Sequence, residues 1–423
     1  MKKQAYKGLD LNYYRETLEN GLEVIMIPME DKKNYFISYA TRFGSEITTF
    51  TPDETKKEVK VPDGVAHFLE HKMFEQEDGV DPFTFFSKSG TGSNASTSFD
   101  FTQYICYGTK KFQENLRYLI RFVNQPYYTD ENVEKEKGII AQELNMYNDM
   151  PDFQLEMKLR QNIYHELPRR IDIGGSVEEI YKITKEDLYL CYNNFYSPNN
   201  MFIVIAGNFN HKEALKIIYE ELELKENRIY PKVKQIKEKK EVRIKNDKFK
   251  GNIEIPKVAV GLKIKKSDLH LDNEFDINLY LLMLTRILFG SSSLFKEKAI
   301  ENKLMTDMYT EWETTDEFKT FYLMAESEEP EELIKEIKKE FKEIKLDEEA
   351  FERSKKVWIA NEVRTTDNVE NMVYNAFDDM LYSKEIVNDK IDRIRNMSFK
   401  KLKDVVKKID FNNISVLTMY PNK

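Results

Sequence analysis

The chain has 423 residues, of which 65 are Lys or Arg and 74 are Asp or Glu, giving a formal net charge of −9. This acidic balance argues against a nucleic-acid partner, and no apolar run approaches the about 18 residues that a membrane span needs. The hydrophobic content of 41% is ample for a large core, and the length favours two domains. Because the two cysteines, Cys106 and Cys191, form no recognisable motif and no apolar leader opens the chain, we expect a cytoplasmic protein.

The first elements in chain order are two strands and a helix. Residues 22–28 and 34–41 are rich in β-branched and aromatic side chains and predict neighbouring strands. A polar loop from about Ser45 to Pro62 leads into a helical pattern from Gly64 to Phe74. Apolar residues repeat there at helical spacing, so we expect this helix to be largely buried.

This helix carries the motif His-x-x-Glu-His, formed by His67, Glu70 and His71. The two histidines are four residues apart on one helix face, where two imidazoles can hold one metal ion. Glu70 lies close enough to that face to act on a metal-bound water. A solvated helix turn without a metal is the alternative. Polar side chains on a buried helix need partners, however, and a metal ion would supply one.

The elements after the motif are a turn, two strands and two long helices. The glycine- and serine-rich stretch Gly90–Ser98 indicates, by composition alone, a plain turn before a strand at Phe99–Tyr107. Helical patterns follow at about Lys111–Asn124 and Asp130–Tyr147, and Phe202–Gly207 predicts a buried strand.

The second long helix offers candidates for a third metal ligand. A catalytic zinc usually has three protein ligands and one position left open for water. Glu136 and Glu143 are seven residues apart and therefore lie on one helix face. The residues between them are mostly apolar and small, which suits a buried helix, where acidic side chains are costly without a cation. Ordinary solvated glutamates are the alternative, and the spacing does not choose between the two.

The second half of the chain repeats the order of elements in the first half. Residues 229–252 are dominated by Lys and Glu and predict a charged linker that contains an edge strand. A capped helix opened by Thr184 is followed by Asn199-Asn200 and an apolar strand, and Ser398 opens a helix followed by Asn412-Asn413 and a strand.

This repetition predicts an α+β fold of two similar domains, each with a mostly antiparallel sheet flanked by helices, related by internal duplication. We expect the metal-bearing domain at 1–228 and a second domain without a metal at 253–423. The helix at Phe275–Phe289 in the second half contains no histidine.

Three segments together resemble the insulinase/pitrilysin family of inverzincin metalloproteases, which includes the mitochondrial processing peptidases. They are HFLEHKMFE at His67–Glu75, GTGSNASTS at Gly90–Ser98, and EKGIIAQEL at Glu136–Leu144. The phrases at Pro62–His67 and Asn145–Asp149 resemble a bacterial YmfH-like branch. The resemblance extends over nearly the whole chain.

The resemblance assigns a role to each residue of the predicted metal site. The implied zinc ligands are His67, His71 and Glu143. Glu70 is the implied general base, which takes a proton as water attacks the peptide carbonyl and returns it to the leaving amine. Glu136 is implied to be an acidic residue that does not bind zinc itself but supports the residues that do.

The resemblance also bears on substrate and partner. It implies that the stretch around Asn94 and Ala95 is an edge strand to which an extended peptide substrate adds. Active members of the family carry an arginine and a tyrosine, seven residues apart, in a domain without zinc, and the matching positions here hold Ala299 and Thr306. Members of this length pair to close a chamber. We therefore expect a dimer with a homologous non-zinc subunit that supplies both side chains.

Together these features predict a zinc-dependent endopeptidase subunit that hydrolyses small or unfolded peptides. One alternative is a dedicated maturation protease that removes leader peptides. An alternative of another class is a non-catalytic scaffold subunit in a peptidase complex, in which the zinc helix is structural. The intact ligands and the intact Glu70 argue against the scaffold.

Overall fold

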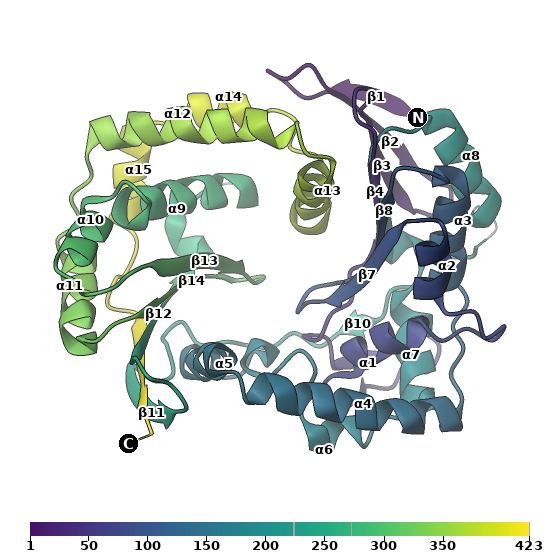
Figure 1. Ribbon diagram of the computed structural model, residues 1–423, viewed down its shortest axis with the longest axis horizontal. Coiled ribbons are helices and arrows are strands. Elements are labelled where there is room, and N and C mark those ends of the chain that lie inside the picture. Colours follow the sequence, from purple (N-terminus) through teal and green to yellow (C-terminus); the bar gives the residue numbers. More distant parts are fainter. Residues whose placement is uncertain (223–224, 272, 423) are drawn as a thin grey trace. The chain divides into compact units, whose positions relative to one another are not determined.

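The computed structural model describes residues 1–222, 225–271 and 273–422. They form two compact units, each assembled from three stretches of the chain (Figure 1). The first unit contains residues 1–145, 171–235 and 362–390, and the second contains 146–170, 236–361 and 391–423.

These units differ from the continuous ranges 1–228, 229–252 and 253–423 expected from the sequence. Residues 146–170 belong to the second unit and residues 362–390 belong to the first, so each unit takes in a segment from the opposite half of the chain. The physical reason is packing. The helix within 146–170 buries its apolar face on the sheet of the second unit, and the helix within 362–390 buries its apolar face on the sheet of the first unit.

The first unit is built on a sheet with the strand order β1-β2-β3-β9-β4-β8-β7. All neighbouring strands pair antiparallel except β3 with β9. A small sheet of order β10-β5-β6 lies in the same unit. The strands are β1 (Lys2–Ala5), β2 (Asn12–Thr17), β3 (Glu23–Pro28), β4 (Tyr35–Thr41), β5 (Thr49–Thr51), β6 (Val59–Lys60), β7 (Gly92–Thr97), β8 (Thr102–Gly108), β9 (Met201–Gly207) and β10 (Lys232–Val233).

Helices cover both faces of the main sheet in the first unit. One face packs on a core shared with α1, α3, α7 and α8, and the other packs on α13, where Phe377 contacts both Phe101 and Phe202. The helices are α1 (Val65–Met73), α2 (Pro82–Lys88), α3 (Phe112–Val123), α4 (Asp130–Asn148), α6 (Val177–Ile180), α7 (Lys185–Phe195), α8 (His211–Leu222) and α13 (Val369–Asp378). The last residues of α4 fall within the second unit.

The second unit is built on a sheet with the strand order β11-β15-β12-β14-β13. Its strands are β11 (Asn246–Gly251), β12 (Lys257–Lys265), β13 (Met308–Thr314), β14 (Phe318–Glu326) and β15 (Ile414–Pro421). Its helices are α5 (Pro151–Ile163), α9 (Glu274–Phe289), α10 (Leu294–Glu301), α11 (Pro330–Lys342), α12 (Glu348–Thr365), α14 (Lys390–Arg395) and α15 (Phe399–Val406). The segment Glu274–Glu301 is long and apolar enough to cross a membrane, but its most apolar window is more than half buried, as in a core helix.

The two main sheets have the same topology. The order β11-β15-β12-β14-β13 repeats β3-β9-β4-β8-β7, and in both sheets the first pair is parallel while the others are antiparallel. The expected α+β fold with two domains of similar topology is therefore confirmed. The edge strand expected within 229–252 is β11, which lies at one edge of the second sheet.

The short distance between α5 and the second sheet depends on one glycine. Leu155, Leu159 and Ile163 on α5 pack on this sheet. A Cβ atom at Gly261 on β12 would lie 2.2 Å from Cδ1 of Ile163, so a larger residue there would require the Ile163 side chain to move. Gly261 thus lets α5, which follows directly after α4 in the chain, pack tightly in the second unit.

Candidate metal centre

Helix α1 presents the motif residues from a fixed starting point. The helix is capped by Gly64, whose φ of 88° lies in the left-handed region that glycine adopts without strain. A Cβ atom on Gly64 would lie 2.2 Å from the carbonyl oxygen of Gly174, so this position also lacks room for a side chain. Val65, Ala66, Phe68 and Leu69 are buried in the core, which leaves His67, Glu70 and His71 on the opposite side, facing α4 and β7.

The two histidines of α1 converge on one carboxylate of α4. The Nε2 atoms of His67 and His71 lie 3.9 Å and 3.3 Å from Oε2 of Glu143. Ligand atoms from the three residues lie within 4.8 Å of one another. Because zinc binds nitrogen and oxygen at about 2.0–2.2 Å, the ligand atoms of a tetrahedral site lie a little over about 3 Å apart. The three side chains fit such an ion with small adjustments.

His67 is suited to act as a neutral donor. Burial and the neighbouring His71 lower the pKa of His67 to about 3, so its ring carries no charge near neutral pH. Its Nδ1 is buried and has no hydrogen-bond partner among the residues that the structure describes. The nitrogen that lies toward Glu143 is Nε2, and a neutral imidazole can offer the lone pair of that atom to a metal ion.

Glu136 contacts His71 from the side opposite Glu143. Its Oε1 lies 3.0 Å from Nδ1 of His71, while Nε2 of the same ring lies toward Glu143. Burial would lower the pKa of His71, but the hydrogen bond to Glu136 and the nearby carboxylates outweigh burial and raise it. Burial likewise opposes ionisation of Glu136, but His71 and Lys72 outweigh it and lower the pKa of that carboxyl. A carboxylate on the outer nitrogen of a histidine ligand is a common arrangement around metals.

Glu70 is the remaining acidic side chain of the site. Burial raises the pKa of Glu70, against the opposing effects of His71 and of a hydrogen bond from Thr97. The hydroxyl of Thr97 donates this bond to Oε2 of Glu70 at 2.9 Å. A half-buried carboxyl with a raised pKa is suited to accept and return a proton near neutral pH. Sequence patterns predict no role for Thr97, because its position opposite Glu70 depends on how β7 lies beside α1.

The stretch Gly90–Ser98 forms a strand over most of its length. The plain turn indicated by its composition is wrong, since Gly92–Thr97 is β7, paired antiparallel with β8. β7 is the last strand of its sheet, and its other edge is unpaired within the described part of the chain. Asn94 is exposed and Ala95 is half-buried. Both lie on the edge strand that was expected, and their role as substrate contacts stays a prediction.

The second unit lacks the arginine and tyrosine at the expected positions. Ala299 lies on α10 and is buried, and Thr306 is exposed in the segment before β13. Lys303, between them, has a φ of 56°, where a glycine would be favoured. Neither Ala299 nor Thr306 can supply a guanidinium or a phenol.

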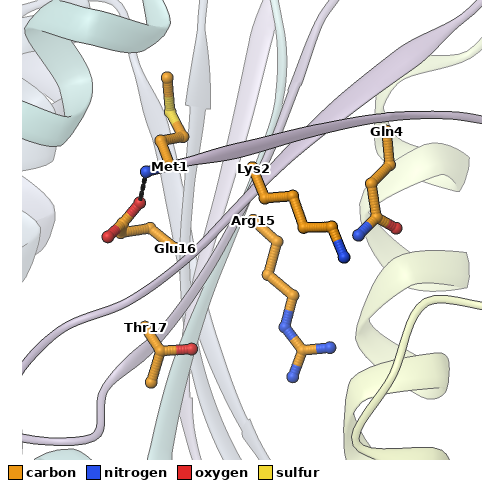
Figure 2. A pocket seen from close by; sticks show the side chains of 6 residues that line it. All are labelled: Met1, Lys2, Gln4, Arg15, Glu16 and Thr17. Carbon is orange, nitrogen blue, oxygen red and sulfur yellow. Dashed lines mark ion pairs between the residues drawn. The ribbon is translucent and has the colours of Figure 1, made fainter.

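The first unit also has a surface pocket, and none of the motif residues belongs to its lining. It has a volume of about 480 Å³ and is formed by the β1–β2 hairpin, from Met1 to Gln4 and from Arg15 to Thr17 (Figure 2). The terminal ammonium of Met1 pairs with Glu16, and Arg15 pairs with Glu23. Because these charges already have partners, the pocket is a weak candidate for chemistry.

Comparison with known proteins identifies the family of this chain. Residues 55–174 match the family model described as Insulinase (Peptidase family M16), and residues 182–357 match the Peptidase M16 inactive domain. YmfH of Bacillus subtilis, described as an uncharacterized zinc protease, is 40% identical over 317 residues, which are 73% of this chain and 73% of YmfH. The chain belongs to peptidase family M16.

Solved structures share the two-domain fold of this M16 chain, and they differ in how much of their own length it covers. A crystal structure of an M16-like peptidase from Alicyclobacillus acidocaldarius is 31% identical, with a TM-score of 0.92 over 99% of this chain and 100% of the other. The periplasmic protease PqqL from Escherichia coli shares the fold at 16% identity, with a TM-score of 0.77 over 100% of this chain but 48% of PqqL. One copy of the M16 fold seen here thus spans about half of the PqqL chain.

Proposed function

We propose that this M16 chain is a zinc-dependent endopeptidase subunit that hydrolyses small or unfolded peptides. The observation that carries the proposal is the convergence of donor atoms from His67, His71 and Glu143 within 4.8 Å, beside Glu70. An arrangement with three protein ligands and an adjacent carboxyl is that of a catalytic zinc site rather than of a closed structural one.

The residues of the site divide the work of peptide hydrolysis. His67, His71 and Glu143 would hold the zinc ion. When bound, zinc supplies a Lewis acid that polarises the peptide carbonyl and makes water acidic enough to react near neutral pH. Glu70 takes the proton from the attacking water and passes it to the leaving amine. The bond from Thr97 to Oε2 leaves Oε1 of Glu70 available to take this proton.

The proposal of an extended substrate is supported by β7, whose outer edge is unpaired among the described residues. A peptide that adds to this edge is bound by main-chain hydrogen bonds, which tolerate many side chains. Thr97, at the end of the same strand, contacts Glu70. A peptide aligned by Asn94 and Ala95 therefore runs toward the carboxyl that carries the proton.

A homologous subunit without zinc would complete the active enzyme. Ala299 and Thr306 offer no guanidinium or phenol to bind substrate and stabilise the oxyanion, so we propose that a partner provides them. The length of PqqL, about half of which matches this chain, supports a working unit made of two such halves. The cytoplasmic location expected from the sequence stays a prediction.

The test is cleavage of internally quenched peptides by the purified chain, first alone and then with a homologous partner subunit. We expect one zinc per chain, weak activity alone, and a gain of at least about tenfold with the partner. A cleavage profile restricted to one leader sequence would favour the maturation protease. Zinc binding without hydrolysis, with every partner and peptide, would favour the scaffold and contradict the proposal.

A further inference from the structure

Lys72 is a fully buried lysine next to a proposed zinc ligand. It follows His71 on α1, and its side chain is 0% exposed. Its ammonium pairs with Glu75, three residues further along the chain and just past the end of α1, and lies 3.8 Å from Oε2 of Glu136. Burying an ammonium is unfavourable unless carboxylates surround it, because the ion loses its hydration. Helix packing alone therefore does not explain why a lysine occupies this buried position.

The explanation lies in how Glu136 is held. Its Oε1 lies 3.0 Å from Nδ1 of His71, and its Oε2 is the oxygen nearest to Nζ of Lys72. Two consecutive residues of α1 thus act on different oxygens of one carboxylate of α4: His71 is within hydrogen-bond distance of Oε1, while the Lys72 ammonium attracts Oε2 by its charge from beyond that distance. This attraction favours the orientation of the carboxylate in which Oε1 points at the imidazole.

We propose that Lys72 is a positioning residue of the metal centre, which acts on His71 through Glu136. The proposal rests on the proposed function, in that the site is taken to bind zinc. With Oε1 of Glu136 fixed, the ring proton of His71 stays on Nδ1 and the lone pair stays on Nε2, the atom 3.3 Å from Glu143. Lys72 thereby selects the ring form of His71 that binds a cation.

A purely electrostatic role for Lys72 predicts the opposite sign. A positive charge near a cation site repels the cation, so removing that charge would tighten zinc binding. A positioning role predicts weaker binding when the lysine is replaced by a neutral residue. A merely structural pair between Lys72 and Glu75 predicts no change in zinc affinity.

The experiment is a double-mutant cycle on zinc affinity. The dissociation constant is measured by competition with a chromophoric chelator for wild type, Lys72→Met, Glu136→Gln and the double variant. We expect Glu136→Gln to weaken binding by about 10–100-fold and Lys72→Met by about tenfold, as for residues that support metal ligands. In the Glu136→Gln background, Lys72→Met should then change the affinity less than about twofold. An equal loss in both backgrounds, unchanged affinity, or tighter binding would overturn the proposal.

Controls separate this result from misfolding and from failure of the proposed function. Lys182→Met removes an exposed lysine that also pairs with a glutamate three residues away, Glu179, and should leave the affinity unchanged. Thermal unfolding of the metal-free variants checks that they are folded. If Lys72→Met does not fold, Lys72→Gln is neutral but polar and should show the same loss. Wild-type protein that binds no zinc would refute the proposed function itself.

Discussion

The hydroxyl of Thr97, the last residue of edge strand β7, donates a hydrogen bond to Oε2 of Glu70 on helix α1 at 2.9 Å. This bond connects the strand that is proposed to align the substrate with the side chain that is proposed to move the proton. The bond occupies one lone pair of Oε2 and restrains the orientation of the Glu70 carboxylate. One hydrogen bond thus joins the proposed substrate strand to the proposed general base.

Thr97→Val should lower kcat by about tenfold with little change in KM. The variant keeps the shape of the side chain but loses a hydrogen bond to a charged group, a contribution of about 1.5–3 kcal/mol. Steady-state kinetics on a quenched peptide measures both constants. Thr97→Ser, which keeps the hydroxyl, should restore most of the activity. A Thr97→Val variant that changes only KM would place Thr97 in substrate binding instead.

Glu70→Gln should retain zinc and lose hydrolysis by at least about 100-fold, since general base catalysis contributes about 10²–10⁴-fold. Glutamine has nearly the same shape but accepts no proton. Zinc content by elemental analysis and peptide cleavage are measured on the same sample. Full turnover by this variant would show that another group carries the proton.

His71→Ala should lose the metal, because Nε2 of His71 is one of three converging donors. Zinc content after dialysis against a weak chelator measures the loss. His211→Ala is the matched control, since His211 lies on α8 and stacks against Tyr14 with ring centroids 4.0 Å apart. The control should keep one zinc per chain. Equal retention of zinc by both variants would contradict the proposed ligand set.

Glu313 makes the stability of the second unit depend on pH. Burial would raise the pKa of the Glu313 carboxyl, but the charges of Arg160 and Arg169 outweigh it and lower the pKa to about 2. Tyr164 also donates a hydrogen bond to it, at 2.8 Å. Because the folded pKa lies below the unfolded value of about 4.5, this group stabilises the fold above about pH 4.5. The stabilisation, about 3 kcal/mol, is lost as the pH falls toward 2.

Glu313→Gln should therefore lower the free energy of unfolding at pH 7 by about 3 kcal/mol, and by less than half of that at pH 3. Urea unfolding followed by tryptophan fluorescence measures the difference. The chain has 2 tryptophans, and Trp312 and Trp358 both belong to the second unit, so the signal reports that unit. Glu311→Gln, at an exposed position of the same strand, is the control. A difference that does not shrink between pH 7 and pH 3 would contradict the assigned pKa.

The sequence was sufficient for the parts of the site that depend on local spacing. His67 and His71 share a helix face because they are four residues apart, and this can be read from the chain alone. Glu136 and Glu143 could not be told apart by spacing, because they lie on one face of α4. Their different contacts, with Nδ1 of His71 and with the two Nε2 atoms, depend on how α4 crosses α1. That crossing is set by tertiary packing, which the helical pattern does not specify.

The domain ranges and the contact from Thr97 were beyond local patterns for a related reason. Capping boxes and alternating strands predicted most elements, as at Thr184, whose side chain bonds the backbone of Asp187. Which sheet a helix covers depends on complementary apolar surfaces far apart in the chain. The apolar pattern of α5 or of α13 does not specify the sheet on which the helix packs. Continuous domains were therefore the simplest expectation.

The exchange of α5 and α13 between the two halves has a consequence for biosynthesis. During translation the sheet of the first unit can form once β9 is complete at Gly207, but one face of that sheet waits for residues 369–378. Ile25, Ile27 and Phe36 contribute to this face and are apolar. Nearly the whole chain must leave the ribosome before this face is covered, which creates an interval in which chaperones or aggregation compete for it. The first unit, which contains the candidate metal centre, is therefore completed late in folding, although most of it is synthesised first.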